Sequence, residues 1–108
     1  MMELSLISES VLLILLSLAE QPRHGYSILQ DVEKMSDGRV KLSTGTLYGA
    51  LRRLLDQDWI EQFEEEQSPR GRKAYRLTST GRRNLQMEVD RMKRMTRLAS
   101  LRVARKES

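Results

Sequence analysis

Residues 43–56 constrain the fold of this chain more than any other segment, because their leucines recur at helical spacing. The intervals are four, three and one residues, which places one apolar stripe along a single helix face: Leu47, Leu51, Leu54 and Leu55. A hydroxyl at Ser43 or Thr44 can begin this helix by accepting hydrogen bonds from the unpaired N–H groups of its first turn. The stripe predicts that this face packs into a core.

The opposite face of the same helix carries hydrogen-bond donors and two fixed positive charges, on Thr46, Tyr48, Arg52 and Arg53. Such a face suits a phosphate-lined groove. A phenol can donate to a phosphate and so fix register on a duplex, and a guanidinium can donate two hydrogen bonds to one base. The alternative is an ordinary solvated, charged helix face.

Charge is graded along the 108 residues, whose formal net charge is +4. Residues 1–38 hold two basic and six acidic side chains, residues 39–76 hold eight and six, and residues 77–108 hold nine and three. A basic second half attracts polyanions, so nucleic acid or an anionic membrane is the expected class of partner. A lysine- and arginine-rich solvated surface is the alternative.

Several function classes are excluded by what the sequence lacks. Without cysteine there is no disulfide or thiolate site, and the single His24 cannot form a zinc cluster alone. No phosphate-cradling glycine loop and no nucleophile with a base occurs, so we expect neither an enzyme nor a bound cofactor or metal. The apolar run 11–16 is far shorter than the roughly 20 residues that span a bilayer. Because Glu3 and Glu9 precede it, a signal peptide is not expected, and we predict a cytoplasmic protein.

Two more helices are expected before residue 43. Residues 8–20 are almost continuously apolar, which indicates burial on several sides, both against the reading helix and against a partner subunit; Ser8 or Ser10 can cap this helix, and Pro22 follows its end. In residues 23–35 an apolar stripe recurs every three residues, at Tyr26, Leu29, Val32 and Met35. We therefore expect Tyr26 inside the core, and a structural or capping role for His24.

After Asp58 the pattern changes from helical to alternating. Residues 59–63 and 73–77 hold most of the aromatic side chains and predict a β-hairpin. Its loop, residues 64–72, is acidic in its first half and basic in its second. Only the basic half can approach a phosphate backbone, because Arg70 and Arg72 flank a glycine that permits close approach. The acidic half is expected to face solvent.

Three helices followed by a hairpin predict a mainly α fold with a small β-hairpin, a winged helix-turn-helix. Three segments then resemble the signature regions of the PadR family of transcriptional regulators, in order and in spacing over nearly the whole chain. They are residues 24–26 (His-Gly-Tyr), residues 45–54 (Gly-Thr-Leu-Tyr, then Leu-Arg-Arg-Leu) and residues 71–81, from Gly71 to Gly81. Two positions depart from the family pattern, Gly49 in place of a proline and Trp59 in place of a glycine.

The resemblance implies a dimeric winged-helix regulator, usually a repressor, which binds a pseudo-palindromic operator in double-stranded DNA and in many members responds to a small, often aromatic, effector. It places the reading helix on residues 43–55 and the wing on residues 64–72. We accordingly expect a DNA-binding domain at residues 1–77 and a dimerisation helix at residues 78–108. The expected DNA contacts are Ser43, Thr44, Thr46, Tyr48, Arg52, Arg53, Arg70, Gly71, Arg72 and Lys73.

The last helix is expected to start at Thr78, a capping candidate, and to carry an apolar seam spaced by four and three. This stripe is too long for one small domain to bury, and the resemblance places the family's dimer helix here. Together with Leu12 of the first helix, this apolar stripe predicts a homodimer interface. Its expected residues are Leu12, Leu85, Val89, Met92, Met95, Thr96, Ala99 and Val103.

Two alternatives to this assignment follow from the same residues. The last helix is basic and amphipathic, as membrane-surface anchors are, but it lacks Trp and Phe for the interface. The other alternative is a winged-helix protein-interaction module without DNA binding, docking through Trp59 or through the methionines of the seam.

Overall fold

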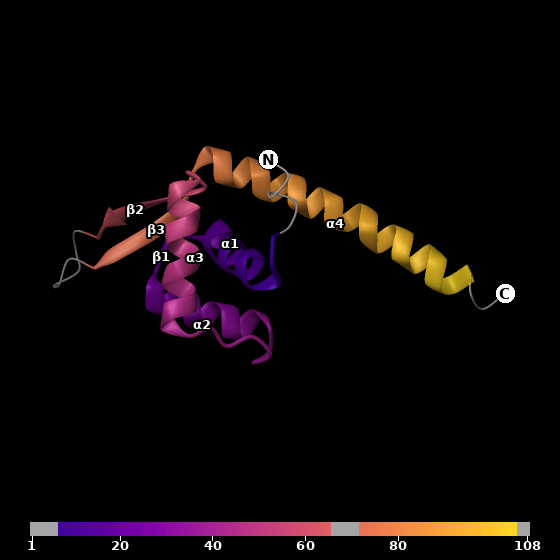
Figure 1. Cartoon of the computed structure of the whole chain (residues 1–108), viewed down its shortest axis with the longest axis horizontal. Coiled ribbons are helices and arrows are strands. Elements are labelled where there is room, and N and C mark those ends of the chain that lie inside the picture. Colours follow the sequence, from indigo (N-terminus) through magenta and orange to yellow (C-terminus); the bar gives the residue numbers. More distant parts are fainter. Residues whose placement is uncertain (1–6, 66–71, 106–108) are drawn as a thin grey trace.

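A computed structural model of the chain describes residues 7–65 and 72–105, which form four helices and three strands (Figure 1). The helices are α1 (Glu9–Glu20), α2 (Gly25–Met35), α3 (Thr44–Asp56) and α4 (Ser79–Arg105). The strands are β1 (Arg23–His24), β2 (Ile60–Glu64) and β3 (Lys73–Leu77). The body of the molecule, α1 to β3, is a winged helix-turn-helix, as predicted, and α4 extends away from it.

Three of the helices begin where a hydroxyl caps them. Ser8 Oγ accepts a hydrogen bond from the Val11 N–H at 3.2 Å, and Ser43 Oγ accepts one from the Thr46 N–H at 3.1 Å. At the start of α4, Thr78 Oγ1 accepts from the Gly81 N–H at 2.9 Å. Each bond satisfies an N–H group that the helix itself leaves unpaired. Ser8, Ser43 and Thr78 are thus the caps among the candidates that the sequence offered.

The sheet has one strand that sequence reasoning missed. β2 and β3 pair antiparallel, from Ile60 opposite Leu77 to Glu64 opposite Lys73, which confirms the predicted hairpin. Arg23 and His24, predicted to lie in the second helix, instead pair with Tyr75 and Ala74 of β3. The strand order is therefore β1-β3-β2.

Arg23 explains why the chain is extended before α2 begins. Its side chain is largely buried and donates to the Ser17 carbonyl at 3.1 Å and to Ser27 Oγ at 3.2 Å. It also forms ion pairs with Glu20 at 2.6 Å and with Asp31 at 3.5 Å. One guanidinium thereby ties the end of α1 to α2, and a helical backbone at residue 23 would give up its pairing with β3.

The core lies between the three helices of the body and one face of the sheet, and α4 adds one residue to it. Its buried members are apolar side chains from every layer: Ile14, Leu15, Leu18, Ile28, Val32, Leu47, Ala50, Leu51, Leu54, Trp59, Ile60, Tyr75 and Leu85. On α1, Leu12, Leu13 and Leu16 pack against this core and remain partly exposed.

The predicted position of Tyr26 is wrong, because its side chain is 66% exposed. The buried residues of α2 are Gly25, Ile28 and Val32. They recur at three and four, so the inward face is turned away from Tyr26 and from Met35, which is 39% exposed. An exposed tyrosine therefore lies in the first turn of α2.

Helix α4 is joined to the body by hydrogen bonds and a close backbone contact. Thr78 donates from Oγ1 to the Asp58 carbonyl at 2.6 Å and from its N–H to the Trp59 carbonyl at 3.0 Å. Gly81 is buried against Trp59, and a Cβ at this position would overlap the Trp59 carbonyl oxygen. After this junction α4 still packs on the body through Leu85 and Val89, and its distal half, residues 93–105, extends away from the body, so that the molecule has extents of 62, 30 and 22 Å (Figure 1).

Candidate nucleic-acid interface

Helix α3 separates its two faces as the sequence indicated. Leu47, Ala50, Leu51 and Leu54 are buried, and Leu55 is partly buried. The opposite face exposes the predicted contact residues Thr44, Thr46, Tyr48, Arg52 and Arg53 together with Gly45. Because the buried face fixes the rotation of α3, the donors and the two guanidinium groups are all directed away from the core.

The charged residues of α3 are available to a ligand. Within residues 7–65 and 72–105, neither Arg52 nor Arg53 forms an ion pair. Ser43 and Thr46 also stabilise the start of α3. Ser43 Oγ donates a hydrogen bond to Thr46 Oγ1 at 2.9 Å and accepts the capping hydrogen bond from the Thr46 N–H. These two hydroxyls hold the first turn of α3 in place.

Gly45 and Gly49 lie on this exposed face between the predicted contact residues. A Cβ at position 45 would meet nothing within 4 Å, and one at position 49 would meet only Arg53 Nη1, at 3.9 Å. The family's proline at position 49 is thus replaced by a glycine on an open surface, and α3 remains a continuous helix over Thr44–Asp56.

The wing supplies a second group of basic side chains. Arg72 and Lys73 are exposed where the chain enters β3. The predicted contacts Arg70 and Gly71 lie outside the described residues. On the acidic limb Glu64 and Glu65 are exposed, as expected, although the Glu65 carboxylate lies 3.7 Å from His24 Nε2.

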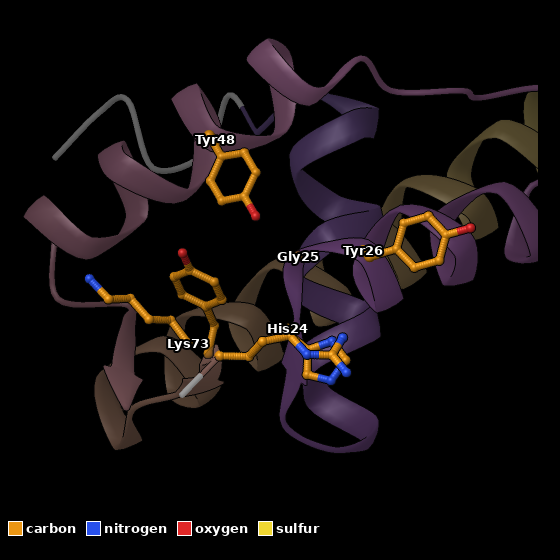
Figure 2. Close-up of a pocket in the computed structure, with 7 residues that line it drawn as sticks. His24, Gly25, Tyr26, Tyr48 and Lys73 are labelled. Carbon is orange, nitrogen blue, oxygen red and sulfur yellow. The ribbon is translucent and has the colours of Figure 1, made fainter. Parts of the chain in front are cut away.

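A cavity of about 270 Å³ joins these elements. Its walls come from the start of α2, the first turns of α3 and the start of β3, and it is lined by His24, Gly25, Tyr26, Tyr48, Arg72, Lys73 and Tyr75. Figure 2 shows the Tyr48 hydroxyl pointing into the space above Gly25. The cavity therefore connects the reading helix to the base of the wing.

Two residues that line this cavity, Tyr75 and His24, differ in how their polar atoms are satisfied. Burial raises the pKa of the Tyr75 phenol, whose oxygen accepts a hydrogen bond from Gln62 Nε2 at 3.2 Å. The Tyr75 side chain is therefore an uncharged part of the cavity lining at neutral pH. His24 precedes α2 as its N-cap residue, but its side chain makes no capping bond, and its buried Nδ1 finds no hydrogen-bond partner among the described residues. The expected capping role is therefore wrong for its side chain, while its backbone pairs with Ala74 of β3.

The predicted interface residues on α4 lie in two different environments. Leu85 is 5% exposed and belongs to the core of its own chain, while Val89 and Met92 are partly buried. The remaining seam residues, Met95, Thr96, Ala99 and Val103, are exposed. Glu88 is buried beside this region and is bonded to Arg91 at 2.5 Å.

The described residues contain no group of histidine and acidic side chains that could hold a metal ion. Nor does any helix in that part of the chain combine the length and apolarity needed to cross a membrane.

Sequence reasoning missed three features of this region: β1, the exposure of Tyr26 and the close approach of Gly25 to Tyr48, whose hydroxyl oxygen a Cβ on Gly25 would overlap. The His-Gly-Tyr segment drew attention to the residues of the first two but not to their conformation. The third joins residues of two helices, so only the packing of α2 against α3 discloses it.

Comparison with known proteins places this geometry in a family. Residues 14–87 match the profile of the transcriptional regulator PadR-like family. A PadR family transcription regulator from Clostridium difficile is 26% identical, with a TM-score of 0.75 over 89% of this chain and 99% of that one. Bacillus subtilis PadR, solved in complex with operator DNA, is 21% identical and shares the fold, with a TM-score of 0.64 over 73% of this chain and 45% of that one.

A curated relative extends the match to a larger protein. An uncharacterized 37.1 kDa protein in transposon TN4556 of Streptomyces fradiae is 36% identical over 89 residues, which are 82% of this chain. The matched region is 24% of that relative, so this chain spans about a quarter of its length.

Proposed function

Because this chain belongs to the PadR-like family of transcriptional regulators, we propose that it binds duplex DNA as a homodimer and represses transcription from a pseudo-palindromic operator. The observation that carries this proposal is the outward face of α3, where Tyr48, Arg52 and Arg53 are exposed opposite four buried residues. In a winged helix-turn-helix such a face enters the major groove, and the wing contacts the flanking backbone. Arg72 and Lys73 supply that second contact.

The exposed seam of α4 supports the dimer. An apolar stripe spaced by four and three suits a helix that meets another helix, and Met95 and Val103 are 51% and 69% exposed in the single chain. The partly exposed leucines of α1, Leu12 among them, would offer the part of their surface that the core leaves open to a partner. A two-fold dimer would present two reading helices to two half-sites.

A small-molecule effector is a further expectation of the family resemblance. Its site would lie between subunits, where an apolar cavity can form, although α4 brings no aromatic side chain to stack on a ring. Retention of the dimer on operator DNA during a titration with small aromatic acids would count against such an effector.

The interaction module without DNA binding has less support. Trp59, one of its two expected docking residues, is 4% exposed and belongs to the core. It cannot serve as a docking surface while the body is folded. The methionine seam of α4 is then the surface left to this alternative, and the dimer already uses it.

Fluorescence anisotropy with labelled duplexes tests the proposal. The parent should bind random duplex at low salt and bind selected genomic fragments more tightly. Replacing Arg52 and Arg53 together by Gln should weaken binding to selected fragments at least tenfold, because each good base contact discriminates by about 1–3 kcal/mol. The double change Arg94→Gln plus Arg97→Gln, on the exposed surface of α4, removes the same charge and should change affinity far less.

The salt dependence of the same titration tests the wing. Counterions released from phosphates make affinity fall with salt, so a variant with Arg70→Ala plus Arg72→Ala should gain much less affinity than the parent on moving to low salt. Equal salt slopes would remove the wing from the interface. A parent protein that binds no duplex even at low salt would refute DNA binding and favour the interaction module.

A further inference from the structure

Helix α4 carries a second stripe of apolar and basic side chains on the side away from the predicted dimer seam. Each of its members follows a residue of that seam by two positions, and two residues turn an α-helix by about 200°. The members are Met87, Arg94, Leu98, Leu101 and Arg105. We call these five residues the back face of α4, because they point away from the seam.

The back face is open to solvent along its whole length. Met87, Leu98 and Leu101 are 62%, 44% and 59% exposed, and both arginines are exposed as well. Figure 1 shows no other helix or strand of the described residues beside the C-terminal turns of α4, drawn in yellow. Because Leu98 and Leu101 are three residues apart, they lie next to each other on the helix surface. One straight ligand can therefore cover both.

A dimer formed through the seam would leave the back face uncovered. In a two-fold pair each α4 turns the same surface to its partner, so both back faces stay on the outside. Association of two back faces is also unfavourable, because residues 93–105 hold five basic and no acidic side chains. Like charges would meet without compensation.

The acidic part of a second copy is a poor complement for these charges. On α1 and α2 the carboxylates of Glu9, Glu20 and Glu33 already form ion pairs with basic residues of their own chain. Arg94 and Arg97, in contrast, form no ion pair within residues 7–65 and 72–105. The back face therefore fits an acidic partner other than this chain.

The combination of leucine and arginine favours an acidic helix over other polyanions. A helix that lies on a membrane collects its apolar residues on one face, whereas α4 divides them between the seam and the back face. A duplex would attract the arginines through its phosphates but would leave Leu98 and Leu101 exposed. An amphipathic helix with acidic residues beside its apolar stripe covers the leucines and pairs with the arginines together.

We propose that the back face of α4 is a docking site for an acidic amphipathic helix of another protein. Leu98 and Leu101 pack against the apolar stripe of that helix, and Arg94, with Arg97 at the edge of the face, pairs with its carboxylates. Each protomer of a dimer offers one such site. Docking of this kind does not depend on DNA binding, and it takes from the proposed function only the dimer that covers the seam.

Anisotropy titrations of a labelled peptide with the full chain test this docking site. The probe is a synthetic peptide of roughly three heptads with Leu at positions a and d and Glu at positions e and g. The control peptide has Lys in place of each Glu. The parent should bind the acidic peptide about tenfold or more tightly than the basic one, because like charges across an interface repel.

Variants of α4 separate the back face from the overall charge of the helix. Leu98→Asp should weaken binding of the acidic peptide about tenfold, because it places a carboxylate inside the contact. Ala104→Asp adds the same charge at an exposed position off both faces and should change affinity by less than about twofold. Equal losses in these two variants would overturn the proposal. Should circular dichroism show lost helix in Leu98→Asp, Leu101→Asp replaces it in the same comparison.

The arginines are tested with the double change Arg94→Gln plus Arg97→Gln. It should weaken the acidic peptide about threefold, as expected for two exposed ion pairs, and should change affinity for duplex DNA far less. Unchanged peptide affinity would remove the charge complementarity on which the choice of an acidic partner depends.

The remaining outcomes identify other occupants of this surface. If sedimentation shows that the dimer dissociates as the acidic peptide binds, the peptide takes the seam and the proposal is refuted; a peptide-bound dimer supports it. Binding that Leu98→Asp abolishes, but to vesicles of phosphatidylserine and phosphatidylcholine in equal parts or to random duplex in place of the peptide, would also refute it. A parent that binds the acidic peptide but no duplex would refute the proposed DNA binding and leave this docking site standing.

Discussion

The body of this molecule and the distal half of α4, residues 93–105, are stabilised in different ways. In the body each helix buries one face, and the charged residues lie over a shared core. In residues 93–105 every side chain is exposed, although the segment is as regular a helix as α3. Isolated helices of this length are marginal in water. The difference teaches that a shared core stabilises the body, whereas the distal half of α4 buries no side chain against its own chain.

Leucine truncation in the two regions should give the largest contrast. Leu51 is 1% exposed and Leu101 is 59% exposed. Leu51→Ala removes buried volume and should lower the free energy of unfolding by about 3 kcal/mol, whereas Leu101→Ala, which lies off the seam, should change it by less than about 0.5 kcal/mol. Urea unfolding at one fixed protein concentration measures both. Equal losses would contradict the division into a packed body and an exposed distal helix.

Glycine substitutions should show where the two regions are joined. Gly81→Ala would push α4 from the Trp59 carbonyl and should cost about 2 kcal/mol, within the range for overpacking. The matched change Gly49→Ala meets only Arg53 Nη1 and should instead stabilise α3 by up to about 1 kcal/mol. Thermal unfolding of both variants decides. A Gly81→Ala protein as stable as the parent would mean that α4 is not fixed to the body at Trp59.

A charge on the seam should act on assembly more than on folding. Met95→Asp should weaken dimerisation about tenfold, because a methionine that a partner buries would be replaced by a carboxylate, and the dimer contains the change twice. Met87 is 62% exposed and lies on another face of α4, so Met87→Asp is the matched control and should leave the dimer intact. Sedimentation velocity over a concentration series measures both. Equal effects would place the interface elsewhere on the helix.

Much of the body could be read from local spacing and capping chemistry. The leucines of α3 fix its inward face, and with it the outward direction of Arg52 and Arg53. Ser8, Ser43 and Thr78 start three helices because each oxygen meets N–H groups only three residues away. The alternation of apolar and polar residues predicted the hairpin of β2 and β3, because successive side chains of a strand point to opposite faces of the sheet.

The site could be read only in part, because its remaining features are contacts between distant segments. The family resemblance drew attention to His24, Gly25 and Tyr26, but periodicity placed Tyr26 in the core, where the observed stripe of α2 excludes it. The use of Gly25 is visible only beside Tyr48, which lies 23 residues further along the chain.

By itself, then, the sequence determined the helices, the hairpin, the two faces of α3 and the basic side chains near the wing, all of which follow from short-range periodicity and composition. Tertiary structure alone decided that Arg23 and His24 form a strand, that Tyr26 is exposed, that Leu85 joins its own core and that Gly25 makes room for Tyr48. The physical reason is that these four outcomes depend on which surfaces compete for burial once α1, α2, α3 and β3 meet, and no local pattern encodes that competition.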